Sequence, residues 1–164
     1  MTEPGDTSMH ASMADAAALI AARFGAAGID VTAGGSGDAT EVSGAWVDRR
    51  GFSSVKAVIT YTTTLAAAAT LNFAANLQDA SDSSGTGAAD FGDALAATVV
   101  ATGPGGGGTV TGVVELDFKL YGADRYFRLQ ATPNLSAANT DVCEFGITYI
   151  LAGATDNPVT ASLV

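Results

Sequence analysis

The feature that most constrains this sequence is an alternation of apolar and polar residues with a period of two, which runs through most of the chain after residue 40. Such alternation places successive side chains on opposite faces of a β-strand, so that one face is buried and the other is solvated. Turn residues interrupt the alternation at intervals of roughly ten or more residues. Short, regularly spaced strands of this kind predict an all-β fold, in the form of an antiparallel β-sandwich.

The strands can be placed from the phase of their apolar residues. The span from Phe91 to Val100 also fits a helical period, and we assign a strand to its end because two valines lead directly into the glycine-rich loop 103–108. Whether the strands form a jelly-roll or an immunoglobulin-like sandwich does not follow from one sequence. We expect about seven strands, over residues 42–47, 55–61, 71–77, 97–101, 114–120, 126–131 and 143–151.

The chain before residue 39 lacks the alternation and is expected to form a separate arm. Residues 12–25 are rich in alanine and predict one short helix. Residues 31–38 are rich in glycine and serine, which predicts a flexible linker. We therefore divide the chain into an arm, residues 1–38, and a sandwich domain with a C-terminal tail, residues 39–164. The helix has a thin apolar face that is expected to dock on another surface, formed by Leu19, Ile20 and Phe24.

Charge and hydropathy limit the partners that the chain can have. The sequence contains 17 acidic and 7 basic residues, for a formal net charge of -10, and the cations are scattered along the chain. Nucleic-acid binding requires clustered lysines and arginines, so we expect no nucleic-acid partner. No basic leader precedes an apolar stretch, and no run approaches the roughly 18 apolar residues of a membrane span. We therefore expect neither a signal peptide nor a membrane partner.

The residue types that catalytic sites require are scarce. His10 is the single histidine and lies in the predicted arm, where nothing would hold it beside a nucleophile. Cys143 is the single cysteine and is in phase with Phe145, which predicts a small buried side chain and not a reactive thiolate. The glycine-rich loop 103–108 lacks the lysine and the following helix of a phosphate-binding loop. We expect no enzymatic activity and no cofactor.

Two groups of charged residues are the candidate sites. Acids in and after a serine- and glycine-rich loop could supply oxygen ligands to Ca²⁺, although solvated acids are the simpler interpretation. These acids are Asp79, Asp82, Asp90 and Asp93. Arginines grouped in so acidic a chain indicate bidentate pairing with carboxylates, either across an interface or within the fold, with Asp48, Asp117 or Asp124. These arginines are Arg49, Arg50, Arg125 and Arg128.

Three short motifs are similar to those of a known family. They are the string Val47-Asp-Arg-Arg-Gly-Phe-Ser-Ser-Val55, the strand end Leu77-Gln-Asp-Ala-Ser-Asp82 and the string Arg125-Tyr-Phe-Arg128. With these motifs, the region from Val42 to Leu151 resembles small proteins encoded in the head gene clusters of tailed phages and of gene-transfer-agent-like elements. Those proteins are regarded as capsid decoration, or cement, proteins.

The resemblance implies a structural virion protein that is made in the host cytoplasm. It would bind the major capsid protein on the outer surface of the shell, as a homotrimer or another symmetric homo-oligomer, and stabilise the capsid. The four grouped arginines and the apolar residues of the arm would then be interface residues. Two alternatives stay open: a tail component of the same virion, such as a tube, terminator or fibre-base protein, and a carbohydrate-binding β-sandwich. In the second, Trp46 and Tyr61 or Tyr149 would stack on sugar rings.

Overall fold

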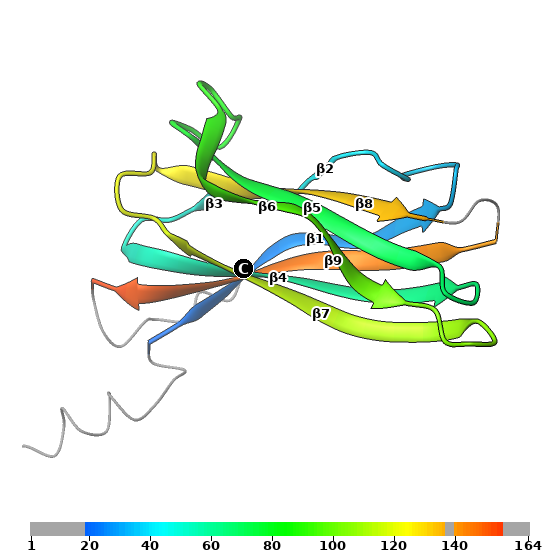
Figure 1. Ribbon diagram of the computed structural model, residues 1–164. Coiled ribbons are helices and arrows are strands. Elements are labelled where there is room, and N and C mark those ends of the chain that lie inside the picture. Colours follow the sequence, from blue (N-terminus) through cyan, green and yellow to red (C-terminus); the bar gives the residue numbers. More distant parts are fainter. Residues whose placement is uncertain (1–18, 137–139, 156–164) are drawn as a thin grey trace, which may run out of the picture.

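The computed structural model describes residues 19–136 and 140–155, which form two antiparallel β-sheets packed face to face (Figure 1). The predicted antiparallel β-sandwich is therefore confirmed. The first sheet has the strand order β1-β9-β4-β7, and the second has the order β2-β8-β5-β6 with β3 also paired to β8. The strands are β1 Ala21–Thr32, β2 Val42–Ser43, β3 Val47–Asp48, β4 Phe52–Leu65, β5 Thr70–Ala80, β6 Ala89–Thr102, β7 Gly108–Lys119, β8 Tyr126–Leu135 and β9 Val142–Ala154.

The strand order is that of a jelly roll. Because β2 and β3 both pair with β8, they act as one interrupted strand, and the chain then has eight strands in sequence. The first pairs with the last, the second with the seventh, the third with the sixth and the fourth with the fifth. Rolling up such a long hairpin gives the two four-stranded sheets of a jelly roll, which decides between the two topologies left open above.

The interior is filled by the inward rows of the central strands. Phe73 of β5 contacts Phe145 of β9 edge to face, with 5.2 Å between ring centroids, and lies 6.0 Å from the ring of Tyr61. These contacts join the two sheets across the core. Cys143 is only 2% exposed, and burial raises the pKa of its thiol to about 12. The prediction of a small buried side chain at this position is confirmed.

The predicted helix is wrong where the structure describes it. Residues 21–25 belong to β1, which pairs antiparallel with β9 from Ala21 opposite Leu151 to Thr32 opposite Val142. Alanine-rich sequences have only a weak local preference, and the unpaired edge of β9 provides a hydrogen-bonding partner that overrides it. Residues 1–18, which hold the rest of the predicted helix, lie outside the described residues.

The predicted linker at residues 31–38 is also wrong, because this segment packs on the sandwich. Val31 and Ala33 are buried in the core. Asp38 accepts hydrogen bonds from the backbone N–H of Gly34 at 2.8 Å and from that of Leu135 at 2.9 Å. One carboxylate thus ties the turn after β1 to the end of β8, so residues 21–38 are part of the sandwich and not of an arm.

Strand β6 is longer than predicted because it is strongly bulged. Ala75 and Leu77 of β5 face Leu95 and Phe91 of β6, so that two residues along β5 correspond to four along β6. Extra residues of this kind bend a strand and increase its twist. They also explain why the spacing of Phe91 and Leu95 resembles a helical period.

Within the described residues, no helix is long and apolar enough to cross a membrane.

Replacing Tyr149 by phenylalanine tests the polar contact in the core. The buried Tyr149 hydroxyl accepts a hydrogen bond from the Leu129 N–H at 2.8 Å, and burial raises its pKa to about 12. Tyr149→Phe leaves that N–H without an acceptor, so we expect a loss of about 1–3 kcal/mol in the free energy of unfolding, measured by urea denaturation. The control Tyr121→Phe, at a side chain that is 92% exposed, should change it by less than about 0.5 kcal/mol. Equal losses of stability in Tyr149→Phe and Tyr121→Phe would show that the hydrogen bond to the Tyr149 hydroxyl does not stabilise the core.

Candidate functional site

All the lysines and arginines of the chain lie toward one end of the sandwich, which we call the arginine end. It is the end at which the arrow of β9 finishes in Figure 1. The cations are scattered along the sequence but lie together in the fold. Antiparallel pairing brings the starts of β1, β4 and β8 beside the end of β7. The seven residues are Arg23, Arg49, Arg50, Lys56, Lys119, Arg125 and Arg128.

The rest of the sandwich carries acids without cations. Acids are interleaved with the cations at the arginine end, so that end is close to electrically neutral and is not a uniformly positive surface. The opposite half therefore accounts for most of the negative charge of the described residues. Its acids are Asp30, Asp38, Glu41, Asp141 and Glu144.

Two of the grouped arginines hold the turns of the arginine end together. Arg49 donates to the backbone oxygens of Ala123 and Asp124, the latter at 2.7 Å. Arg125 donates twice to Oδ2 of Asp48, at 2.6 and 3.1 Å. The Arg125 hydrogen bond holds the pKa of Asp48 below its ordinary value. The side chains of Arg49 and Arg125 therefore both make contacts within the fold, which was one of the two alternatives considered for the grouped arginines.

Arg128 is fixed between two neighbours. Its guanidinium lies 4.5 Å from the centroid of the Trp46 ring and donates to Oε1 of Gln78 at 2.9 and 3.1 Å. Gly85 of the loop between β5 and β6 packs against the same indole ring. This stacking uses the aromatic surface that a sugar would need. Tyr61 and Tyr149 are buried in the core, so the three aromatic residues proposed for carbohydrate stacking do not form a surface.

Arg50 differs from the other grouped arginines, because its side chain makes no hydrogen bond or ion pair with a described residue. It borders an open groove of about 500 Å³, which we call the Arg50 groove. Phe24 is 67% exposed in this groove and Arg23 lies beside it. Two arginines and an exposed phenyl ring among the lining residues suit a protein segment that presents a carboxylate next to an apolar side chain. The remaining lining residues are Trp46, Val47, Asp48 and Phe52.

The three apolar residues assigned to the predicted helix do not share one face. Leu19 is half-buried, whereas Ile20 is 40% exposed and lines a separate shallow hollow beside Lys56 and Phe118. Phe24 lies in β1 and points into the Arg50 groove. Their interface role stays a prediction, and the groove was missed because a strand, not a helix, positions Phe24.

Three of the four acids considered for calcium binding make separate hydrogen bonds within the fold. Asp79 accepts the backbone N–H of Asp124 at 2.7 Å, and Asp90 accepts from the side-chain amides of Asn76 and Gln78. Asp82 closes its own loop by accepting hydrogen bonds from Ser84 and Thr86, which lower its pKa. Within residues 19–136 and 140–155, no three acidic, histidine or cysteine side chains are grouped as metal ligands. Calcium binding by these acids and by Asp93 stays a prediction.

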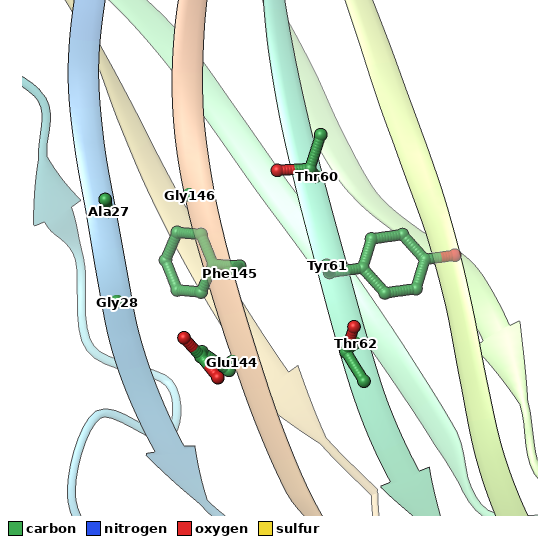
Figure 2. A pocket seen from close by; sticks show the side chains of 8 residues that line it. All are labelled: Ala27, Gly28, Thr60, Tyr61, Thr62, Glu144, Phe145 and Gly146. Atoms are coloured by element: carbon green, nitrogen blue, oxygen red, sulfur yellow. The ribbon is translucent and has the colours of Figure 1, made fainter.

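A shallow hollow of about 300 Å³ lies on the outer face of the first sheet, over β1, β9 and β4 (Figure 2). Gly28 and Gly146 form its floor because they carry no side chains, and Thr60 and Thr62 border it. Glu144 is the single acid among its lining residues, which include no base. One carboxylate without a second acid, a base or a nucleophile beside it does not make a catalytic set.

The chain is similar to parts of solved virus structures. No protein-family model matches the sequence, and no curated protein matches it either. Chains of infectious bursal disease virus, strains Gx and Gt, align over 85% of this chain at 9% and 12% identity, with TM-scores of 0.43 and 0.44. This chain spans 33% of those chains. A chain of cowpea mosaic virus top component, naturally occurring empty particles, aligns over 87% of this chain and 94% of its own length, at 7% identity and a TM-score of 0.32.

Replacing Asp48 by asparagine tests the ion pair at the arginine end. Because this pair is partly exposed, we expect Asp48→Asn to lower the free energy of unfolding at pH 7 by only about 0.5–1 kcal/mol. A carboxylate whose pKa is lowered by folding stabilises the fold above its unfolded pKa, which is near 3.8, and the stabilisation is lost as the pH falls through the folded pKa. The difference between wild type and variant, measured by urea denaturation, should therefore disappear in acid.

The matched control is Asp93→Asn, at an exposed acid outside this pair. It should leave stability at pH 7 within about 0.5 kcal/mol of wild type. A difference between Asp48→Asn and wild type that persists unchanged below pH 3 would show that the charge of Asp48 is not its source.

Proposed function

We propose that this protein is a structural component of a virion that decorates the outer surface of a tailed-phage capsid and stabilises it by binding the major capsid protein. The observation that carries the proposal is the Arg50 groove, whose lining includes Arg23, Arg50 and the exposed Phe24. Arginine and aromatic side chains carry much of the binding energy at protein interfaces. An exposed phenyl ring beside a guanidinium that pairs with no described residue therefore suits a protein partner.

The strand order supports the same class of protein. Jelly-roll sandwiches form viral capsid domains and also lectin domains. Arg128 stacks on the ring of Trp46, and Tyr61 and Tyr149 are buried, which disfavours the lectin alternative. The sequence resemblance to decoration proteins favours the capsid among the uses of this fold. Fold alone does not assign function, so the groove and its residues are what the experiment must test.

The uneven distribution of charge suits a protein that attaches by one end. If the arginine end faces the shell, the opposite half, with its five acids and no cation, faces solvent. A strongly negative exposed surface keeps soluble copies apart before they bind and keeps decorated particles apart afterwards. This orientation places the Arg50 groove against the capsid.

The proposal is tested by co-sedimentation of the purified protein with expanded phage heads that lack it. We expect saturable binding at a fixed ratio to the major capsid protein. Arg50→Glu should weaken this binding by roughly tenfold or more, because it places a negative charge where a carboxylate is expected to bind. The control Glu144→Lys changes charge in the opposite half and should bind like wild type.

Two outcomes would contradict the proposal. If the protein does not bind heads but forms rings or tubes in solution, it belongs to the tail. If Arg50→Glu and Glu144→Lys weaken binding equally, attachment depends on net charge and not on the groove. Removing residues 1–18, which leaves β1 intact, separately measures whether the predicted arm contributes to attachment.

A further inference from the structure

The four edge strands of the two sheets differ in how well they could pair with another strand. The pairing of β1 shifts register twice between Phe24 and Ile29, β6 shifts three times, and β2 and β3 have two residues each. Bulges and very short strands are devices by which proteins prevent pairing at a sheet edge. Strand β7 has neither, because it pairs with β4 without a shift from Gly108 to Lys119. No described strand pairs with its outer edge (Figure 1).

The backbone groups on the outer edge of β7 can be identified from the hydrogen bond that follows the strand. The Leu120 N–H donates to the Ser53 oxygen directly opposite, at 2.9 Å. Hydrogen-bonded pairs alternate along an antiparallel ladder, so the intervening residues of β7 direct their N–H and C=O groups away from β4. These residues also carry the exposed side chains of the strand. Counting back from the end of β7, they are Lys119, Asp117, Glu115, Val113, Thr111 and Thr109.

We propose that a second copy of this chain pairs with this edge, β7 antiparallel to β7, about a two-fold axis at Val113. In this register the outward-directed residues face one another, as a hydrogen-bonded ladder requires. Val113, which is 54% exposed in the single chain, meets Val113 of the second copy. Glu115 lies opposite Thr111 and Asp117 opposite Thr109, so each carboxylate faces a hydroxyl and no acid faces an acid.

The charge of the edge also permits pairing between identical chains. Lys56 of β4 contacts Glu115 at 3.0 Å and Asp117 at 2.9 Å, so one cation is shared by the two carboxylates. The part of β7 before Glu115 is uncharged. The repulsion expected between two copies with a net charge of -10 is therefore reduced along this strand.

The neighbouring strand supports a second copy as the occupant. A two-fold axis between antiparallel strands is perpendicular to the sheet, so it also brings β6 of one copy toward β6 of the other, since β6 continues directly into β7 on this side of the sandwich. Ten of the 14 residues of β6 are exposed, including Val99 at 53%, and no charge occurs from Ala94 to Thr102. The same dimer would cover this apolar strand, whose own edge is too bulged to pair.

The first test is sedimentation velocity of the full chain over a range of concentrations. We expect wild type to form a dimer, and Val113→Lys to raise the dimer dissociation constant by roughly a hundredfold or more, because two ammonium groups would meet on the axis. The matched control is Val142→Lys, at an exposed valine of the central strand β9. It adds the same charge away from the edge and should leave dimerisation unchanged. Circular dichroism checks that both variants fold like wild type.

The second test measures the register and does not depend on weakening the dimer. Opposite residues of a hydrogen-bonded pair lie about 5.5 Å apart between Cα atoms, which a disulfide can span. Val113→Cys should therefore form a covalent dimer under mild oxidation. Glu115→Cys alone should form no covalent dimer, because residue 115 of one copy lies opposite residue 111 of the other. The double variant with Glu115→Cys and Thr111→Cys should cross-link. Wild type controls for Cys143, which is buried.

A monomer at all concentrations would overturn the proposal, and so would a dimer that Val113→Lys leaves intact. Cross-linking of Glu115→Cys alone with none by Val113→Cys would overturn the register. These measurements use the free protein, so their failure leaves the head-binding experiment unaffected, and the two proposals can fail separately.

Discussion

The structure depends on the pairing of β4 with strands that lie far from it in the sequence. This strand pairs with β9 on one side and with β7 on the other, in nearly continuous register along its length. These ladders fix the direction of every neighbouring strand and leave the inward row of β4 facing Phe73 and the rest of the second sheet. They also determine which turns share an end of the molecule. The arginine end, and the edge that β7 leaves open, both follow from this arrangement.

The sequence pattern predicted the strands whose two faces meet different environments. In β5 and β9, one face packs in the core and the other meets solvent, so the alternation is strong. The pattern did not predict β1, because Phe24 points outward and the alanines contribute little on either face. Gly25 also interrupts the alternation, and it is required because a side chain there would collide with Ile147 of β9. What stabilises β1 is the backbone pairing to β9, which leaves little trace in side-chain patterning.

The candidate site was predicted only in part, for a related reason. The pairing of grouped arginines with carboxylates was expected, and Asp48 was among the partners considered for them. That Arg125 is the residue that contacts it, 77 positions away, depends on which turns the sheets place together. The Arg50 groove requires in addition that β1 present Phe24 beside Arg50. One signal for the arginine end was present in the sequence, because no lysine or arginine occurs between Lys56 and Lys119. This span runs to the opposite end of the sandwich and back twice, through β4, β5, β6 and β7.

The jelly-roll topology has a consequence for how the chain folds during synthesis. The first strand pairs with the last, so β1 leaves the ribosome well before β9 exists to pair with it. At about 5–20 residues per second, the alanine-rich start of the chain waits several seconds or more for its partner. The closing of such long loops also makes folding slow. Until translation reaches β9, β1 has no partner strand, and the exposed strand edges of a newly made chain can pair with a wrong strand.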